Sequence, residues 1–192
     1  MRRRSVNSVD DAEPSLVNKV IEVDRSLTAA EVRHAFGGAL ALAYHTLEPR
    51  ATADIDVNVT ADAADAERVL RALPDGVAWT EADIGRVHED EQVRLWWGRT
   101  PVDLFFRASE FHDGAADRAE LQPFGAYRLP FLAAQDLVVF KSLFDRPKDW
   151  VDIASMHAAG AFDVEAVVSA LRSLLGDDPR VDHLLRVASG SR

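Results

Sequence analysis

The sequence predicts an α/β (α+β) protein in which a mixed sheet is flanked by helices and the C-terminal part is helical. Short segments of alternating apolar and polar residues are interleaved with helical patterns up to about residue 130, and only helical patterns follow. Within the 192 residues we expect an α/β core at 14–130 and a helical region at 131–192 packed on it. Residues 1–13 are polar and poor in aromatic side chains, so we expect them to be disordered.

Each element is predicted by its pattern and its stop signals. In the core, apolar spacing predicts helices at 15–23, 39–45, 63–73 and 111–121, and Thr28 with Glu31 resembles a capping box for a further short turn. Alternation predicts strands at 53–59, 93–97 and 102–106, the last two joined as a hairpin through 98–101, and a short extended segment at 127–130. In the C-terminal part, proline and glycine breaks separate helices at 132–144, 148–158, 164–175 and 181–187.

Composition and charge exclude several classes of protein. The chain has no cysteine, which excludes disulfides and thiolate metal sites, and its six histidines lack the spacing of zinc ligands. No apolar run is long enough to span a bilayer, so we expect no membrane partner and a cytoplasmic location. The net charge of −10 argues against a broad nucleic-acid-binding face. It leaves room for a local basic pocket, for which the candidates are Arg50, Arg99, Lys141, Arg146 and Lys148.

Three aspartates on two predicted strands indicate a metal site. Asp54 and Asp56 project to one side of the strand at 53–59, and the apolar residues project to the other. Two carboxylates so close together are unfavourable without a counter-ion, and Mg²⁺ prefers such oxygen ligands together with substrate phosphates. Asp103 lies between apolar residues on a later strand. If the two strands are neighbours, Asp103 becomes a third carboxylate that could hold metal and help to deprotonate an attacking hydroxyl.

A glycine pair precedes the first of these strands. Gly37 and Gly38 open a predicted helix, and such a turn lets the backbone approach phosphate groups. Each feature also has an ordinary structural explanation: a simple turn for the glycines, a solvated strand edge for the Asp-x-Asp pair, and a hairpin end for Asp103. Their order along the chain favours a site for a nucleoside triphosphate and Mg²⁺, with Mn²⁺ as an alternative metal.

Lys141 lies in an otherwise apolar helical segment. Facing inward, it would need an anionic partner such as phosphate, because an unpaired buried lysine is costly. Facing outward, it would reach solvent and pair with Asp145 at i+4. Asp149 and Asp152 share one face of the next predicted helix. The alternative role of Asp149 is to favour the N-terminus of that helix, where Pro147 is a suitable first-turn residue.

Two blocks of sequence resemble a known family. The first block is Gly37-Gly-Ala-Leu-Ala-Leu-Ala-Tyr-His45 followed by Arg50-Ala-Thr-Ala-Asp-Ile-Asp56, and it looks like the signature of the DNA polymerase β-type nucleotidyltransferase superfamily. The second block is Asp136-Leu-Val-Val-Phe-Lys141 followed by Arg146-Pro-Lys-Asp-Trp-Val-Asp152. Together, in this order, they resemble the AbiEii-like (MenT-like) nucleotidyltransferase toxins of toxin–antitoxin systems. The resemblance covers residues 30–160.

This resemblance implies a nucleotidyltransferase-type fold and Mg²⁺-dependent transfer of a nucleoside monophosphate from an NTP to an acceptor hydroxyl. The acceptor would be RNA, at a tRNA 3′ end, and the protein would be a toxin with a cognate antitoxin as its partner. The metal ligands would be Asp54, Asp56 and Asp103, and the catalytic residues would be these three with Lys141 and Asp152. The nucleotide-binding residues would be Gly37, Gly38, Arg50, Thr52, Lys141, Arg146, Lys148 and Asp149.

Two alternatives remain beside this interpretation. One is a nucleotidyltransferase that modifies a small molecule such as an aminoglycoside, or a protein side chain, which the low net positive charge favours. The other is a non-catalytic nucleotide-binding domain of the same fold. It is suggested by Ala39, because many members of the superfamily have Ser or Thr after the glycine pair.

Overall fold

The computed structural model describes residues 13–46 and 52–190. Of the segment 1–13 that was predicted to be disordered, residues 1–12 lie outside the described residues, and Glu13 accepts hydrogen bonds from Lys19 and from the N–H of Arg99. Its helices are α1 (Leu16–Ala29), α2 (Gly38–Thr46), α3 (Ala66–Arg71), α4 (Glu81–Asp90), α5 (Glu110–Asp117), α6 (Ala134–Phe144), α7 (Pro147–Ala158), α8 (Val164–Leu175) and α9 (Pro179–Ala188), with a 3₁₀ helix η1 (Ala63–Asp65). Its strands are β1 (His34–Phe36), β2 (Ile55–Asp62), β3 (Val77–Ala78), β4 (Gln92–Trp97), β5 (Thr100–Arg107), β6 (Glu120–Phe124) and β7 (Tyr127–Phe131).

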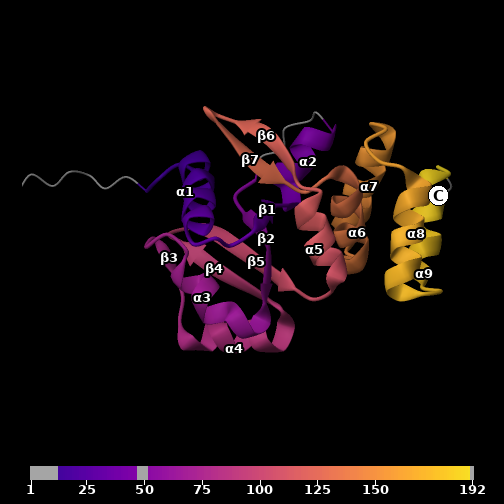
Figure 1. Ribbon diagram of the computed structural model, residues 1–192. Coiled ribbons are helices and arrows are strands. Elements are labelled where there is room, and N and C mark those ends of the chain that lie inside the picture. Colours follow the sequence, from indigo (N-terminus) through magenta and orange to yellow (C-terminus); the bar gives the residue numbers. More distant parts are fainter. Residues whose placement is uncertain (1–12, 47–51, 191–192) are drawn as a thin grey trace, which may run out of the picture.

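The described strands form one mixed sheet in the order β3-β4-β5-β2-β1-β7-β6 (Figure 1). β2 runs parallel to β5 and β1 runs parallel to β7, whereas the other neighbouring strands are antiparallel. The predicted fold class, a mixed sheet flanked by helices with a helical C-terminal part, is therefore confirmed.

The polar and apolar faces of the central strands follow from their alternating sequences. Along β2, Ile55, Val57, Val59 and Ala61 are buried, and the residues between them are partly exposed. β4 alternates in the same way. Residues directly opposite one another in neighbouring strands point to the same face of a sheet. The register of the strands therefore decides which polar side chains meet.

Some predicted elements differ from the structure. The predicted helix at 111–121 is wrong at its end, because α5 stops at Asp117 and the chain turns into the edge strand β6 at Glu120. The separate turn predicted from Thr28 to Glu31 is also wrong, since α1 continues through Thr28 and buries Leu27 fully. The strands β1 and β3 were not predicted, because they are only three and two residues long and too short to show an alternating pattern. Helix α4 was not predicted either.

The C-terminal helices pack on α2, and α6 also reaches β5 of the sheet, where the ring centroids of Phe144 and Phe105 lie 5.4 Å apart. Both α6 and α7 pack against α2, α8 packs against α6, and α9 packs against α6 and α7. In Figure 1, α8 and α9 lie at the end of the molecule opposite β3. This packing places α6 and α7 beside the helix that begins at the glycine pair. Among the described residues, no helix combines the length and the apolar character needed to cross a membrane.

Candidate active site

Three aspartates meet on one face of the sheet. Asp56 of β2 and Asp103 of β5 are direct neighbours in the parallel pairing of these strands, so their side chains point to the same face. Asp54 immediately precedes β2 and lines the same hollow as the other two. The two strands are therefore neighbours, as a joint site for the three carboxylates requires.

An arginine already neutralises one of these carboxylates. Arg94 of β4 lies opposite Asp103 in the antiparallel pairing. Its Nε donates a hydrogen bond to Oδ1 of Asp103 and its Nη2 donates one to Oδ2, each at 2.7 Å. Its Nη2 also lies 3.9 Å from Oδ2 of Asp54. These contacts raise the pKa of Arg94 above its ordinary value, chiefly through the hydrogen bonds to Asp103. Such a bidentate pair fixes the geometry of both groups.

Burial and the neighbouring carboxylates raise the pKa of Asp56 to about 6. Burial is the largest cause, followed by the negative charges of Asp103 and Asp54, while Lys141 and Lys148 act in the opposite direction. The folded protein therefore disfavours the ionised form of Asp56. A bound cation would favour that form, because it supplies the missing positive charge.

Asp54 and Asp56 fit a divalent cation. Their carboxylates are the hard oxygen ligands that Mg²⁺ prefers, and both line the hollow. Among the described residues, no group of three or more acidic, histidine or cysteine side chains stands ready to hold a metal ion. Asp103 is held by Arg94, so a metal ion at Asp103 would compete with this arginine for the carboxylate. The role of Asp103 as a ligand stays a prediction.

The glycine pair is needed for the close approach of α2 to Asp56. Gly38 has a φ of +54°, and a Cβ at this position would lie 1.9 Å from Oδ2 of Asp56. The backbone N–H of Gly37 donates to the carbonyl oxygen of Asp56 at 2.9 Å, and a Cβ on Gly37 would meet the side chain of Asn58. A side chain at position 38 would therefore displace the carboxylate.

Thr52 fixes the segment that leads into β2. Its hydroxyl accepts a hydrogen bond from the N–H of Asp54 at 3.2 Å and lies 3.3 Å from the carbonyl oxygen of the same residue. Thr52 therefore holds the backbone of Asp54 and also lines the hollow. Arg50, predicted to bind nucleotide, lies outside the described residues.

Lys141 faces inward and is paired with aspartates of α7. Its Nζ lies 2.7 Å from Oδ2 of Asp152 and 3.5 Å from Oδ1 of Asp149, and Lys141 is only 7% exposed. The alternative in which Lys141 reaches solvent and pairs with Asp145 is wrong. Asp145 instead ends α6 and accepts a hydrogen bond from Nε1 of Trp150. Burial of Lys141 alone is therefore no argument for a phosphate, because the protein supplies its own counter-charges.

Asp149 is fully buried and holds Arg146 as well as Lys141. It accepts hydrogen bonds from Nε of Arg146 at 2.6 Å, from its Nη2 at 3.2 Å and from its backbone N–H at 3.3 Å. Burial opposes the ionisation of Asp149, but the hydrogen bonds from Arg146 and the charges of Lys141 and Arg146 together lower its pKa. The alternative role at the start of α7 is thus confirmed, because Asp149 binds the N-cap backbone.

One hollow of about 360 Å³, which we call the carboxylate hollow, brings these residues together. The predicted residues in its lining are Gly38, Thr52, Asp54, Asp56, Asp103, Lys141, Arg146, Lys148, Asp149 and Asp152. Ala39 lines it as well, as do three residues that were not predicted as site residues, Arg94, Phe105 and Val151. Arg99, a candidate for the basic pocket, does not: it lies at the turn between β4 and β5, where its N–H donates to Glu13.

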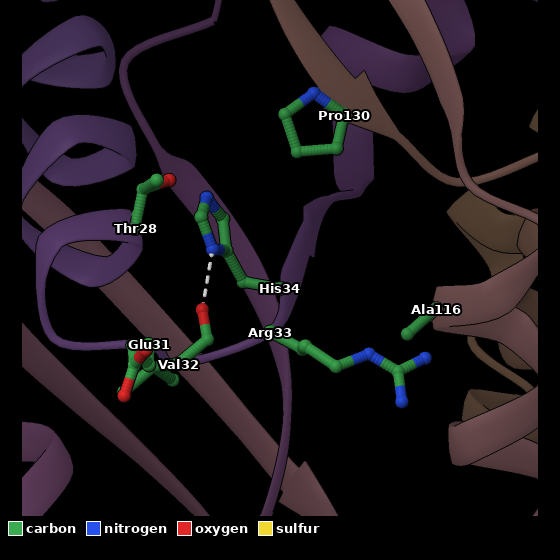
Figure 2. A pocket seen from close by; sticks show the side chains of 7 residues that line it. All are labelled: Thr28, Glu31, Val32, Arg33, His34, Ala116 and Pro130. Atoms are coloured by element: carbon green, nitrogen blue, oxygen red, sulfur yellow. Dashed lines mark hydrogen bonds between the residues drawn. The ribbon is translucent and has the colours of Figure 1, made fainter.

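A separate hollow between α1, β1 and α5 has a different character (Figure 2). It is lined by Thr28, Glu31, Val32, Arg33, His34, Ala116 and Pro130, and none of the predicted site residues is among them. Both ring nitrogens of His34 are engaged, Nδ1 with the carbonyl oxygen of Val32 at 2.9 Å and Nε2 with Oδ1 of Asp24 at 3.1 Å. His34 is therefore a structural residue, and this hollow offers no set of catalytic groups.

Solved structures identify the fold. The solution structure of the antibiotic-resistance factor ANT(2'')-Ia matches with a TM-score of 0.56 and 12% identity, over 90% of this chain and 97% of that chain. The crystal structure of ANT(2'')-Ia in complex with adenylyl-2''-tobramycin matches with a TM-score of 0.54 and 13% identity, over 82% of this chain and 95% of that chain. This chain has the nucleotidyltransferase fold. No family model and no curated protein matches the sequence.

The solved structures confirm the fold that the resemblance of the two sequence blocks implies. At 12% and 13% identity the likeness establishes the fold alone. The resemblance to AbiEii-like toxins in particular stays a prediction. Evidence about activity must therefore come from the residues of the carboxylate hollow.

Proposed function

We propose that this protein is a cytoplasmic, Mg²⁺-dependent nucleotidyltransferase that transfers a nucleoside monophosphate from an NTP to an acceptor hydroxyl. The observation that carries the proposal is that two distant sequence blocks converge in one hollow. Asp54 and Asp56 enter it from β2, whereas Lys141, Lys148 and Asp152 enter it from α6 and α7. The nucleotidyltransferase fold supports the same class of reaction.

The NTP would lie with its triphosphate toward the start of α2. The glycine turn leaves the first N–H groups of this helix close to the hollow, and the helix dipole favours negative charge there. Lys148 and Arg146 are exposed at the rim, where they can meet phosphates without a large desolvation cost. Lys141 adds a buried positive charge that Asp152 and Asp149 hold in place.

Asp54 and Asp56 would hold the metal. When bound, Mg²⁺ neutralises phosphate charge and polarises the phosphoryl group, and Mn²⁺ could take the same oxygen ligands. The acceptor oxygen forms a bond to the α-phosphorus while the bond from this phosphorus to the oxygen that bridges to the β-phosphate breaks. The proton of the acceptor hydroxyl passes to the Asp103 carboxylate, and pyrophosphate leaves.

Transfer of this proton to Asp103 becomes easier when Arg94 gives up one of its oxygens, because Arg94 engages one lone pair on each oxygen. The Arg94 side chain is 55% exposed, whereas that of Asp103 is 13% exposed, so the arginine is the partner with room to move. Turned away from Asp103, Arg94 would still lie in the hollow and could contact a phosphate of the NTP. Until substrate arrives, Arg94 thus keeps the Asp103 carboxylate hydrogen-bonded and neutralised.

For the acceptor we propose an RNA 3′ end, that of a tRNA, and for the protein the role of a toxin restrained by a cognate antitoxin. The resemblance to AbiEii-like toxins supports this assignment. A second candidate acceptor is a small molecule such as an aminoglycoside. It is supported by the net charge of −10 and by the complex of ANT(2'')-Ia with adenylyl-2''-tobramycin.

The test is transfer of label from each of the four α-³²P-labelled NTPs, with Mg²⁺, to total RNA, total protein and a panel of aminoglycosides. Wild type is compared with Asp54→Asn/Asp56→Asn and with the exposed-turn control Asp75→Asn. We expect label in RNA with wild type and with the control, and none with the double variant. Circular dichroism checks that the double variant is folded.

Equal transfer by the double variant would overturn the metal assignment. Label confined to aminoglycosides or to protein would support nucleotidyl transfer but contradict RNA as the acceptor. NTP binding without transfer to any acceptor would favour the non-catalytic alternative. Growth of cells that express the protein adds a second readout: for a toxin, the wild-type protein should arrest growth and the double variant should not.

A further inference from the structure

A second hollow of about 300 Å³ adjoins the carboxylate hollow. The two share Arg94, Asp103, Phe105 and Arg146, and the second extends along β4 toward Arg86 of α4. We call this second hollow the acceptor groove. Asp103, the proposed proton acceptor, therefore lies at the junction of two spaces. The carboxylate hollow is lined by Gly38, Lys141 and Lys148, and the acceptor groove is lined by none of these.

This division suits in-line displacement at the α-phosphorus. The attacking oxygen must approach on the side opposite to the leaving pyrophosphate, with a base close to its proton. If the triphosphate lies at Gly38, Lys141 and Lys148, the acceptor hydroxyl must arrive from another direction. The acceptor groove is such a direction, and it opens directly onto Asp103.

The acceptor groove combines arginines with an exposed aromatic ring. Phe144 is 39% exposed, its ring centroid lies 5.4 Å from that of Phe105, and the guanidinium of Arg146 lies 4.7 Å from its centroid. Arg86 forms an ion pair with Asp83 through Nη1, and Arg94 donates to Asp103 through Nε and Nη2. A guanidinium has five N–H donors, so both arginines retain donors for a further anion.

We propose that the acceptor groove binds the 3′ end of a single-stranded RNA, with its terminal base against Phe144 and a backbone phosphate at Arg86. This inference rests on the proposed nucleotidyl transfer. Unpaired bases stack on aromatic rings and guanidinium planes, and phosphates bind arginine, which are the two kinds of side chain present. Each of the three arginines in the lining is fixed by a carboxylate, Arg86 by Asp83, Arg94 by Asp103 and Arg146 by Asp149, and each keeps N–H donors that a phosphate can accept.

The test measures RNA binding and NTP binding separately. Anisotropy of a 5′-fluorescein-labelled single-stranded RNA reports the first, and fluorescence of a mant-labelled nucleotide with Mg²⁺ reports the second. Phe144→Ala should weaken RNA binding by a factor of about 5 to about 150, the range for loss of one stacked base. Arg86→Gln should weaken RNA binding and lower its salt dependence by about one counterion. Neither variant should change NTP binding.

Matched controls separate these effects from surface changes in general. Tyr127→Ala removes another exposed ring, 43% exposed on β7, and Arg68→Gln removes an arginine of α3 that pairs with Asp65 at i+3, as Arg86 pairs with Asp83. Both should bind RNA as wild type does, and Phe144→Trp should retain most of the binding.

Two results would overturn the acceptor groove as the RNA site. The first is that wild type transfers label to RNA and that Phe144→Ala and Arg86→Gln have the same KM for the RNA acceptor as wild type. The second is transfer to aminoglycosides alone. Failure of the proposed function would look different, because label would then reach no acceptor even with wild type.

Discussion

Replacing Asp56 by asparagine should make the metal-free protein more stable at neutral pH. Asp56 is partly buried beside Asp103 and Asp54, and these surroundings raise its pKa from 3.8 to about 6. At pH 7 the wild type must therefore keep an ionised carboxylate in a place that disfavours it. Asparagine has nearly the same shape and no charge, so Asp56→Asn removes this cost while it also removes a proposed metal ligand.

The size and sign of the effect follow from proton linkage. A shift from 3.8 to about 6 corresponds to about 3 kcal/mol, as an upper estimate. The folded state binds the proton more tightly than the unfolded state, so this group lowers the free energy of unfolding as pH rises from about 4 to about 6. Asp56→Asn should therefore match wild type near pH 4 and exceed it by up to about 3 kcal/mol at pH 7. For a chain of this length, each kcal/mol shifts Tm by about 2–4 °C.

The assay is thermal unfolding of both proteins in EDTA between pH 4 and pH 8, repeated with Mg²⁺. Without metal, the Tm difference should open between pH 4 and pH 6 in favour of the variant. With Mg²⁺, wild type alone should gain stability, because the metal binds its ionised carboxylates. A variant that is equally or less stable than wild type across the whole pH range would refute the reasoning about Asp56.

Three further predictions concern the surroundings of the carboxylates. In urea unfolding, Gly38→Ala should lower the free energy of unfolding by at least about 2 kcal/mol more than Gly125→Ala does. Both glycines have positive φ, but only at Gly38 would the added Cβ collide with another group, 1.9 Å from Oδ2 of Asp56. Lys141→Met should lower the free energy of unfolding by about 3 kcal/mol in the same measurement, since it removes the ammonium group 2.7 Å from the buried Asp152 carboxylate, and adding Asp152→Asn should recover part of the loss. Arg94→Gln should tighten Mn²⁺ binding to the nucleotide-free protein in calorimetric titration, because the competing cation at Asp103 is gone; unchanged affinity would count against Asp103 as a ligand.

The parts of the site that could be predicted from the sequence depend on local periodicity. Alternation along β2 sends Asp56 to the face opposite Ile55 and Val57, and the structure shows that arrangement. The parallel pairing with Asp103 needed knowledge of which strands are neighbours, which no local pattern contains. The expectation that these two strands are neighbours came only from the fold that the two sequence blocks imply.

The contact between Arg94 and Asp103 was within reach of the sequence, although it was not predicted. The hairpin between β4 and β5 pairs Trp97 with Thr100. Counting back three residues along one strand and forward three along the other pairs Arg94 with Asp103. Alternation then places both side chains on one face, where opposite charges attract. A hairpin of known turn length therefore carries information about the site that the search for motifs passed over.

The partners of Lys141 could not be derived in this way. Its burial depends on how α6 packs against α7, a tertiary contact between two helices whose relative rotation the sequence does not state. Sequence reasoning offered two outcomes, solvent or phosphate, and the structure shows a third, in which Asp152 and Asp149 take up the charge. Two carboxylates one helical turn apart on the next helix were the available signal, since such a face can enclose one ammonium group.

Asp149 illustrates how a residue of a sequence block can serve a site without offering its charge to the ligand. Its side chain is fully buried and its oxygens are taken by Arg146 and Lys141. Arg146 in turn lines both the carboxylate hollow and the acceptor groove. The spacing from Arg146 to Asp149 is that of a helix N-terminus, so the contact that begins α7 also sets the guanidinium at the boundary between the two spaces. The same three-residue spacing therefore serves the fold and the proposed meeting point of NTP and acceptor.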